Sequence, residues 1–127
     1  MNEDLRKPDY DLEAAISNNP QNYDAETIET VLAEVPGAND ELSWHWIVKF
    51  KPDYPIAPFA YLVGWCDFTG WYCKSGLSAE MAGTLEEAAN LAPEKEQFSN
   101  RRVRETLLAQ LRGQKPYGVY DRLPNES

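Results

Sequence analysis

The sequence contains few cysteine, histidine and glycine residues, and these scarcities exclude several kinds of site. Of its 127 residues, two are cysteine, one is histidine and seven are glycine. The cysteines lack a Cys-x-x-Cys spacing, which removes the support for a thioredoxin-like redox role. The scattered glycines form neither a Walker motif nor G-x-G-x-x-G, so the usual phosphate-binding loops are excluded.

Long hydrophobic runs are also missing. The longest apolar stretch covers residues 56–66 and is interrupted by Pro58 and Gly64, whereas a membrane-spanning helix needs about 20 apolar residues. The N-terminal thirteen residues are charged and lack the apolar region of a secretory signal. We therefore expect a soluble, cytoplasmic protein that does not bind membranes and whose cysteines are reduced.

Basic residues are outnumbered by acidic ones. The chain has 21 Asp and Glu against 12 Lys and Arg, a net charge of −9, which excludes a simple electrostatic nucleic-acid binder. Residues 1–43 hold eleven acids and two bases, whereas residues 99–127 hold three acids and six bases. This segregation indicates an acidic surface that docks on a basic protein partner. The alternative is a set of solvated faces that keep a small protein soluble.

The length and composition predict one domain. A chain of 14.5 kDa with 43% hydrophobic residues can form its own core. We expect residues 1–127 to be a single domain, with 1–8 as a flexible arm and 119–127 as a tail. Asp9 or Asp11 can cap a first helix that ends at Asn18.

A second helix is predicted over residues 24–37, capped by Asp24 and ended by Pro36 and Gly37. Its apolar residues follow the i, i+3, i+4, i+7 spacing of a helix face. These residues are Ile28, Val31, Leu32 and Val35. On such a helix Glu26, Glu29 and Glu34 would form an acidic docking surface.

The middle of the chain predicts a three-stranded antiparallel sheet. Ten of the fifteen aromatic residues lie between Trp44 and Tyr72, and residues 44–50 and 59–66 alternate in the manner of strands. Residues 71–75 form a third predicted strand after a turn at Asp67–Gly70. One face of this sheet is expected to form the core against the helices. That face would hold Trp44, Trp46, Phe50, Phe59, Tyr61, Val63 and Trp65.

Two further helices are predicted after the sheet, which makes the fold class α+β. Thr84 opens a capping box for a helix to about Leu91. The last helix is expected to begin at Ser99 or Asn100 and to end at Gly113. Its arginines either pair with acids, Arg101 with Glu105 and others with the N-terminal helices, or form a small patch that binds phosphate or acids. These arginines are Arg101, Arg102, Arg104 and Arg112.

The segment from Gly64 to Cys73 carries the string G-x-C-D-F-T-G-W-x-C. This string resembles a motif, G-x-C-D-[YF]-T-G-W-x-C, of a group of small, uncharacterised bacterial and phage proteins. Residues 33–37 and 110–118 also resemble that group. The resemblance implies a phage or mobile-element setting and no particular activity. The chain departs from the group in a proline-rich insert before Phe59 and in Tyr72, where a polar residue is expected.

Candidate chemistry gathers around the same turn. Cys66 and Cys73 are expected on one sheet face, with His45 facing Cys66 across the sheet. With Asp67 these residues are weak candidates for a metal site, because their spacing fits zinc poorly. A cysteine nucleophile would need His45 as its base. We therefore expect no metal, no cofactor and no catalytic residues.

The sequence predicts a small acidic, non-enzymatic interaction protein, monomeric or homodimeric, that binds a basic protein partner. A special case is a phage-type inhibitor of a nucleic-acid-binding host machine, anti-CRISPR-like, that acts by DNA mimicry. The alternative is a ligand-binding or catalytic domain with a site at the Cys66–Cys73 turn. The predicted partner-binding residues are Glu26, Glu29, Glu34, Asp67, Phe68, Thr69, Trp71 and Tyr72.

Overall fold

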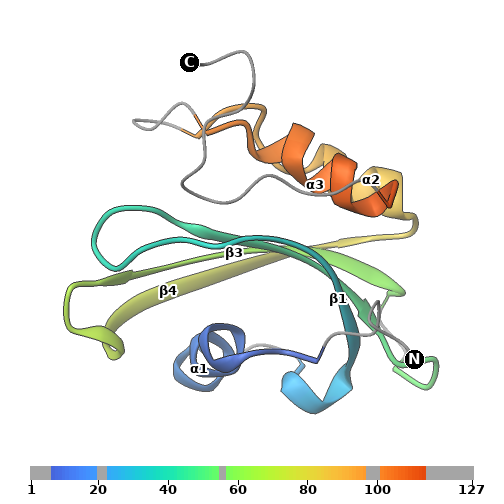
Figure 1. Ribbon diagram of the computed structural model, residues 1–127. Coiled ribbons are helices and arrows are strands. Elements are labelled where there is room, and N and C mark those ends of the chain that lie inside the picture. The colour runs from blue at the N-terminus through green and yellow to red at the C-terminus, as the bar shows by residue number, and fades with distance from the viewer. Residues whose placement is uncertain (1–6, 20–22, 55–56, 97–100, 114–127) are drawn as a thin grey trace.

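A computed structural model describes residues 7–19, 23–54, 57–96 and 101–113 and consists of one antiparallel sheet between two layers of helices (Figure 1). The predicted arm (except Lys7 and Pro8), the tail and the caps Ser99 and Asn100 lie outside these residues. The strands follow chain order: β1 (Ile28–Val35), β2 (Trp44–Phe50), β3 (Phe59–Asp67) and β4 (Gly70–Ala82). The α+β class and the antiparallel sheet are confirmed, but the sheet has four strands rather than three.

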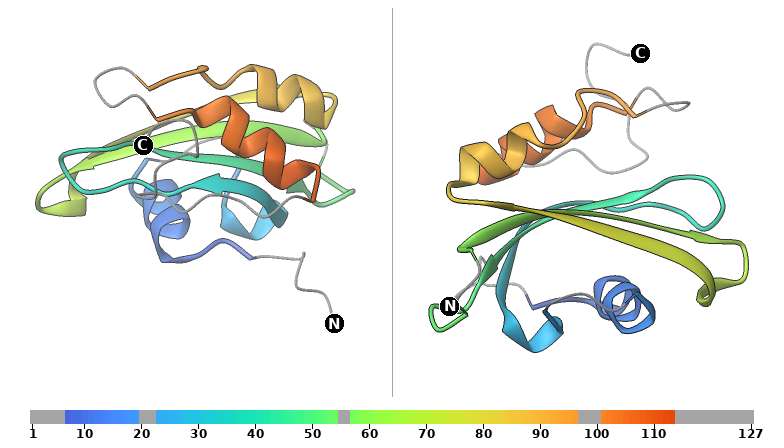
Figure 2. Two further views of the ribbon diagram at one scale, coloured as in Figure 1. Left: turned by 45° about the horizontal axis from the view of Figure 1, so that its top comes forward. Right: turned by 180° about the vertical axis from the view of Figure 1, so that it is seen from behind.

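The helices cover both faces of the sheet (Figure 2). Helix α1 (Tyr10–Asn18) lies on one face, and α2 (Leu85–Asn90) and α3 (Val103–Leu111) lie on the other. Asp9 caps α1 and Thr84 caps α2, as predicted. Gly113 follows α3 with a φ of +79°, which suits its predicted role in ending that helix. Within the described residues, no helix has the length and apolar character needed to cross a membrane.

The prediction of a helix over residues 24–37 is wrong. Asp24 caps only a 3₁₀ turn (Ala25–Thr27), and the chain then continues as β1, paired with β2. The register shifts within β1 explain the misleading pattern. They place Ile28 and Val31 in the core on the α1 side and Val35 in the core on the α2–α3 side. An irregular strand thus acquires the three-residue spacing that is typical of a helix.

The aromatic residues predicted to share one core face are divided between two. Trp46 pairs with Leu62, and Ile47 pairs with Tyr61. Because paired residues share a sheet face, Trp44, Trp46 and Phe50 pack under α1 with Leu62. Tyr61 packs with Ile47 beneath α2 and α3, where partly buried Phe59 and Val63 join the core. Helices from both ends of the chain were expected to pack on the sheet, but against one face rather than with a core on each face.

Strand β4 is longer than the predicted strand 71–75 because it runs on to Ala82 along β3. Leu77, Ala79 and Met81 are only partly buried beside the α1-side core. The second half of β4 therefore lacks the strong hydrophobic alternation that would have predicted a strand from the sequence. Trp65 lies across Gly76, where an added Cβ would be only 2.4 Å from the indole Nε1. Glycine at this position therefore leaves room for the tryptophan, and Trp65 lies over the neighbouring strand rather than in the core.

Candidate functional site at the turn end of the sheet

The β1–β2 connection and the β3–β4 turn lie together at one end of the sheet (Figure 1). The backbone N–H of Asp40 donates a 2.7 Å hydrogen bond to the carbonyl oxygen of Cys66, which joins the two segments. Asp40 has a φ of +63°, a conformation that aspartate and asparagine adopt more readily than most residues. We call residues 38–42 and 65–74 the turn end.

The predicted turn at Asp67–Gly70 is confirmed. Asp67 Oδ1 accepts a 2.9 Å bond from the backbone N–H of Thr69 and a further bond from the Thr69 hydroxyl. Gly70 has a φ of +102°, which a residue with a side chain rarely adopts. The hydrogen bonds from Thr69, with smaller help from Gly70 and Lys74, lower the pKa of Asp67 despite its partial desolvation. The turn therefore presents a fixed carboxylate.

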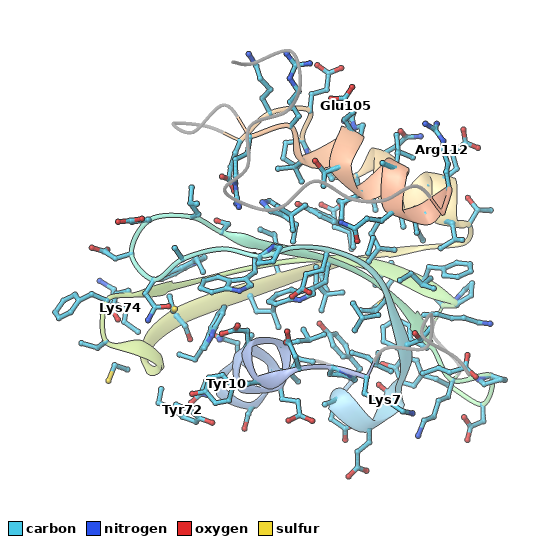
Figure 3. All side chains as sticks on the ribbon, in the orientation of Figure 1. Lys7, Tyr10, Tyr72, Lys74, Glu105 and Arg112 are labelled. Atoms are coloured by element: carbon cyan, nitrogen blue, oxygen red, sulfur yellow. The ribbon has the colours of Figure 1, made fainter. Side chains whose placement is uncertain are left out.

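Three aromatic side chains of the turn end are exposed to solvent. Phe68 is 76% exposed, Tyr72 is 65% exposed and Trp65 is 45% exposed. Tyr10 of α1, 64% exposed, lies beside Tyr72 (Figure 3). Large exposed aromatic residues grouped in this way are typical of protein–protein contact surfaces.

Trp71, also predicted to bind a partner, lies instead in the core and is 3% exposed. Its ring packs against Trp44 at 4.9 Å and Trp46 at 6.5 Å between centroids. Its indole Nε1 donates a 2.9 Å hydrogen bond to Asp11 Oδ1 in α1. Trp71 therefore anchors α1 to the sheet and supports the turn end from beneath.

A shallow hollow of about 430 Å³ lies between the two segments of the turn end. Of the residues that the structure describes, three with carboxylates, Asp40, Glu41 and Asp67, line it together with one cation, Lys74. Trp65 and Phe68 supply its aromatic wall. Carboxylates beside aromatic rings suit an arginine or lysine side chain, which can form an ion pair and rest its cation on the ring.

The three acids predicted on a helix do not form a common surface. Glu34 Oε2 accepts a 3.1 Å hydrogen bond from Trp46 Nε1, so this carboxylate is part of the sheet's own structure. Glu29 lies 3.5 Å from Lys49 Nζ in a partly exposed ion pair. Glu26 is exposed in the 3₁₀ turn. The predicted acidic helix face is therefore absent from this segment. The acidic residues considered below for partner binding are those of the turn end.

The cysteines and the histidine are not brought together. Cys66 is 3% exposed, and its thiol donates a 3.3 Å hydrogen bond to Asn39 Oδ1, whereas Cys73 is exposed. Cys66 pairs with Ser75 of β4, and the register shifts between Cys66 and Asp67 beside the turn. Burial, with smaller effects from Asp11 and Asp67, raises the pKa of the Cys66 thiol, which disfavours a reactive thiolate.

His45 lies on the opposite face of the sheet and takes part in a buried polar cluster that the sequence reasoning missed. Its Nδ1 is 2.8 Å from the Tyr61 hydroxyl and its Nε2 is 2.8 Å from Glu96 Oε2. Arg101 donates to both Glu96 oxygens at 2.9 and 2.7 Å. The predicted Arg101–Glu105 pair is replaced by this contact, and Glu105 lies 3.7 Å from Arg102.

This cluster supports the β1–β2 connection. Arg101 also donates to the backbone carbonyl oxygens of Pro36 at 2.6 Å and Ser43 at 2.7 Å. Burial raises the pKa of the Tyr61 hydroxyl. The lone histidine in an alternating strand was the one signal for the cluster, since Glu96 and Arg101 lie more than fifty residues away in sequence. Among the described residues, no group of three His, Cys, Asp or Glu is placed to hold a metal ion.

Comparison with known proteins adds no constraint on the turn end. No family model matches the chain, and neither a curated protein nor a solved structure matches it. The resemblance to a group of bacterial and phage proteins therefore stays a prediction, and the geometry of the turn end carries the functional conclusion.

Proposed function

We propose that the chain is a non-enzymatic binding protein whose turn end docks on a basic surface of a protein partner. The observation that carries this proposal is the grouping of exposed Phe68 and Trp65 with the carboxylates of the hollow, while Tyr72 of the same β3–β4 hairpin is also exposed. The aromatic rings would supply the apolar contact area. The carboxylates and the net charge of −9 would steer a basic partner toward the surface and fix its orientation.

An inhibitor that imitates nucleic acid is a narrower form of this proposal. In that form the carboxylates of Asp40, Glu41 and Asp67 would occupy a groove that the partner uses for phosphate groups. The phage setting suggested by the G-x-C-D-F-T-G-W-x-C string is in keeping with such an inhibitor. Its distinguishing property would be a steep loss of affinity with added salt.

The alternative, a catalytic or ligand site built on Cys66, has less support. Its thiol donates to Asn39, its pKa is raised, and His45 lies on the other sheet face. If Cys66→Ser abolished the protein's function while the fold survived, this alternative would replace the docking proposal.

The test is affinity capture from a bacterial lysate, with partners quantified by mass spectrometry over a range of salt concentrations. Two variants alter the turn end: Phe68→Ser removes an exposed ring, and Asp40→Asn with Glu41→Gln removes two charges while keeping side-chain shape. Asparagine also tolerates the positive φ at position 40. We expect both variants to lose the same captured protein.

The matched control is Asp53→Asn with Glu80→Gln, which removes two exposed charges outside the turn end. It should capture the partner as the unchanged protein does. Equal capture by all four proteins would contradict the docking surface. If capture is lost with Phe68→Ser but does not change with salt concentration, the proposal of an aromatic docking surface is supported. The same result would overturn nucleic-acid mimicry.

A further inference from the structure

A second hollow, of about 530 Å³, lies against α3 on the face of the sheet opposite α1. Glu105 and Arg112, which lie at its border, are marked in Figure 3, far from Lys74 of the turn end. Among the described residues, its lining combines four cations, two carboxylates and one leucine. These residues are Lys95, Arg102, Arg104, Arg112, Glu94, Glu105 and Leu108. The hollow is therefore locally positive in a chain that carries a net charge of −9.

Arg104 is held in position within this hollow. Its Nε donates to the carbonyl oxygen of Ala92 at 2.9 Å, and its Nη2 donates to that of Asn90 at 3.3 Å. Both acceptors belong to the end of α2 and the residues after it. The guanidinium is thus fixed chiefly by backbone groups, and a ligand would meet a donor group that is already ordered.

The two carboxylates of the hollow are loosely engaged. Glu94 lies 3.9 Å from Arg104 Nη1 with its side chain 83% exposed, and Glu105 lies 3.7 Å from Arg102 with its side chain 64% exposed. A tight charge-assisted hydrogen bond would measure about 2.7–2.9 Å. Both carboxylates can therefore turn into solvent and be replaced by a more highly charged anion.

We infer that this hollow binds a small molecule bearing a phosphate or pyrophosphate group. Guanidinium groups match phosphate oxygens in geometry and bind them through paired hydrogen bonds. The volume falls in the range of roughly 300–1,000 Å³ that is typical of small-molecule sites. Leu108 and the flat faces of the arginines would contact the rest of the ligand. This site is separate from the docking surface at the turn end and does not depend on it.

The sequence left open whether these arginines pair with the N-terminal acids or form an anion-binding patch. Across the described residues, Arg101 and Arg104 bond to groups between Pro36 and Glu96, and the sheet separates α3 from α1. The N-terminal helix therefore supplies no counter-charge to the hollow, which favours the anion-binding patch.

The test is isothermal titration calorimetry of the full chain with inorganic pyrophosphate and, separately, with ADP. Lys95→Gln with Arg112→Gln removes two exposed cations from the hollow, and we expect affinity to fall by about tenfold or more. Lys51→Gln with Lys74→Gln is the control, because it removes two exposed cations elsewhere. Glu94→Gln with Glu105→Gln should strengthen binding, since it removes the competing carboxylates.

The two probes distinguish the sources of the phosphate group. Tighter binding of ADP than of pyrophosphate supports a nucleotide-like ligand, and equal binding supports an inorganic one. No saturable heat with either probe at millimolar concentration overturns the inference. An equal loss of affinity in the Lys95/Arg112 and Lys51/Lys74 variants also overturns it. Binding would then depend on the net charge of the protein and not on the residues of the hollow. Thermal unfolding of each variant shows that the fold is retained.

Discussion

At the scale of single residues, the neighbours Arg101 and Arg102 have different surroundings. Arg101 is largely buried and donates to Glu96 and to two backbone carbonyl groups. Arg102 is about one-third exposed and lies 3.7 Å from the mostly exposed Glu105. A buried ion pair that loses one partner leaves an uncompensated charge, whereas a surface pair is screened by water.

We predict that Arg101→Ala lowers the free energy of unfolding by about 3 kcal/mol or more, because Glu96 is left buried without its cation. Arg102→Ala should cost about 1 kcal/mol or less. Urea denaturation at neutral pH measures both values. Equal effects from the two substitutions would show that the His45–Glu96–Arg101 cluster does not hold the fold.

Asp67 gives a prediction about pH. Its pKa is lowered in the folded chain, chiefly by Thr69, so its contribution to stability is present above the unfolded pKa and is lost as pH falls through the folded pKa. Thr69→Ala should therefore raise the pKa of Asp67 toward its ordinary value, as measured by NMR titration of the carboxyl carbon. The stability difference between the unchanged protein and Asp67→Asn should shrink on acidification. A pKa unchanged by Thr69→Ala would assign the shift to another group.

At the scale of the elements, α3 covers the outer edge of β1. Gln110 Oε1 accepts a 2.9 Å hydrogen bond from the backbone N–H of Glu34, and Gln110 Nε2 donates at 2.8 Å to the carbonyl oxygen of the same residue. One side-chain amide thus takes the place of a neighbouring strand. An uncovered edge offers these groups to other chains.

We predict that Gln110→Ala lowers the free energy of unfolding by about 1–2 kcal/mol, since two backbone hydrogen bonds lose their partner. It should also increase self-association, because part of the β1 edge becomes available for pairing. Denaturation and light scattering measure the two effects. Glu105→Ala, an exposed change on the same helix, is the control and should alter neither.

The elements that the sequence predicted correctly have local signals. Asp9 and Thr84 cap their helices, and Asp67, Thr69 and Gly70 form a turn through contacts within three residues. The β1 strand was missed because its register shifts imitate helical spacing. Whether a segment with that spacing becomes strand or helix depends on its pairing with β2, which no local pattern contains.

At the scale of the whole molecule, much of the candidate site depends on contacts between distant segments. Phe68 and Tyr72 were predicted to bind a partner and are exposed, whereas Trp71 was predicted with them and is buried under α1. Asp40 joins them only because its segment hydrogen-bonds to Cys66. The alternation of residue types along β3 shows which residues share a face of the sheet. It could not show that helices cover both faces.

The distribution of charge also belongs to this scale. The hollow of the turn end and the arginine-lined hollow against α3 have no described lining residue in common, and Figure 3 marks Lys74 of the first far from Glu105 and Arg112 of the second. The two proposed sites therefore use different surfaces. A basic partner at the turn end and a phosphate-bearing ligand at α3 could be bound at the same time.

The unequal burial of the four tryptophans allows the intrinsic fluorescence of the protein to report on binding. Trp44, Trp46 and Trp71 are at most 4% exposed, whereas Trp65 is 45% exposed and lines the hollow of the turn end. Collisional quenching by iodide should therefore reach chiefly the emission of Trp65. A partner that covers the turn end would shield this emission from iodide, whereas a ligand seated against α3 would leave it accessible, so unlabelled protein can report which of its two surfaces is occupied.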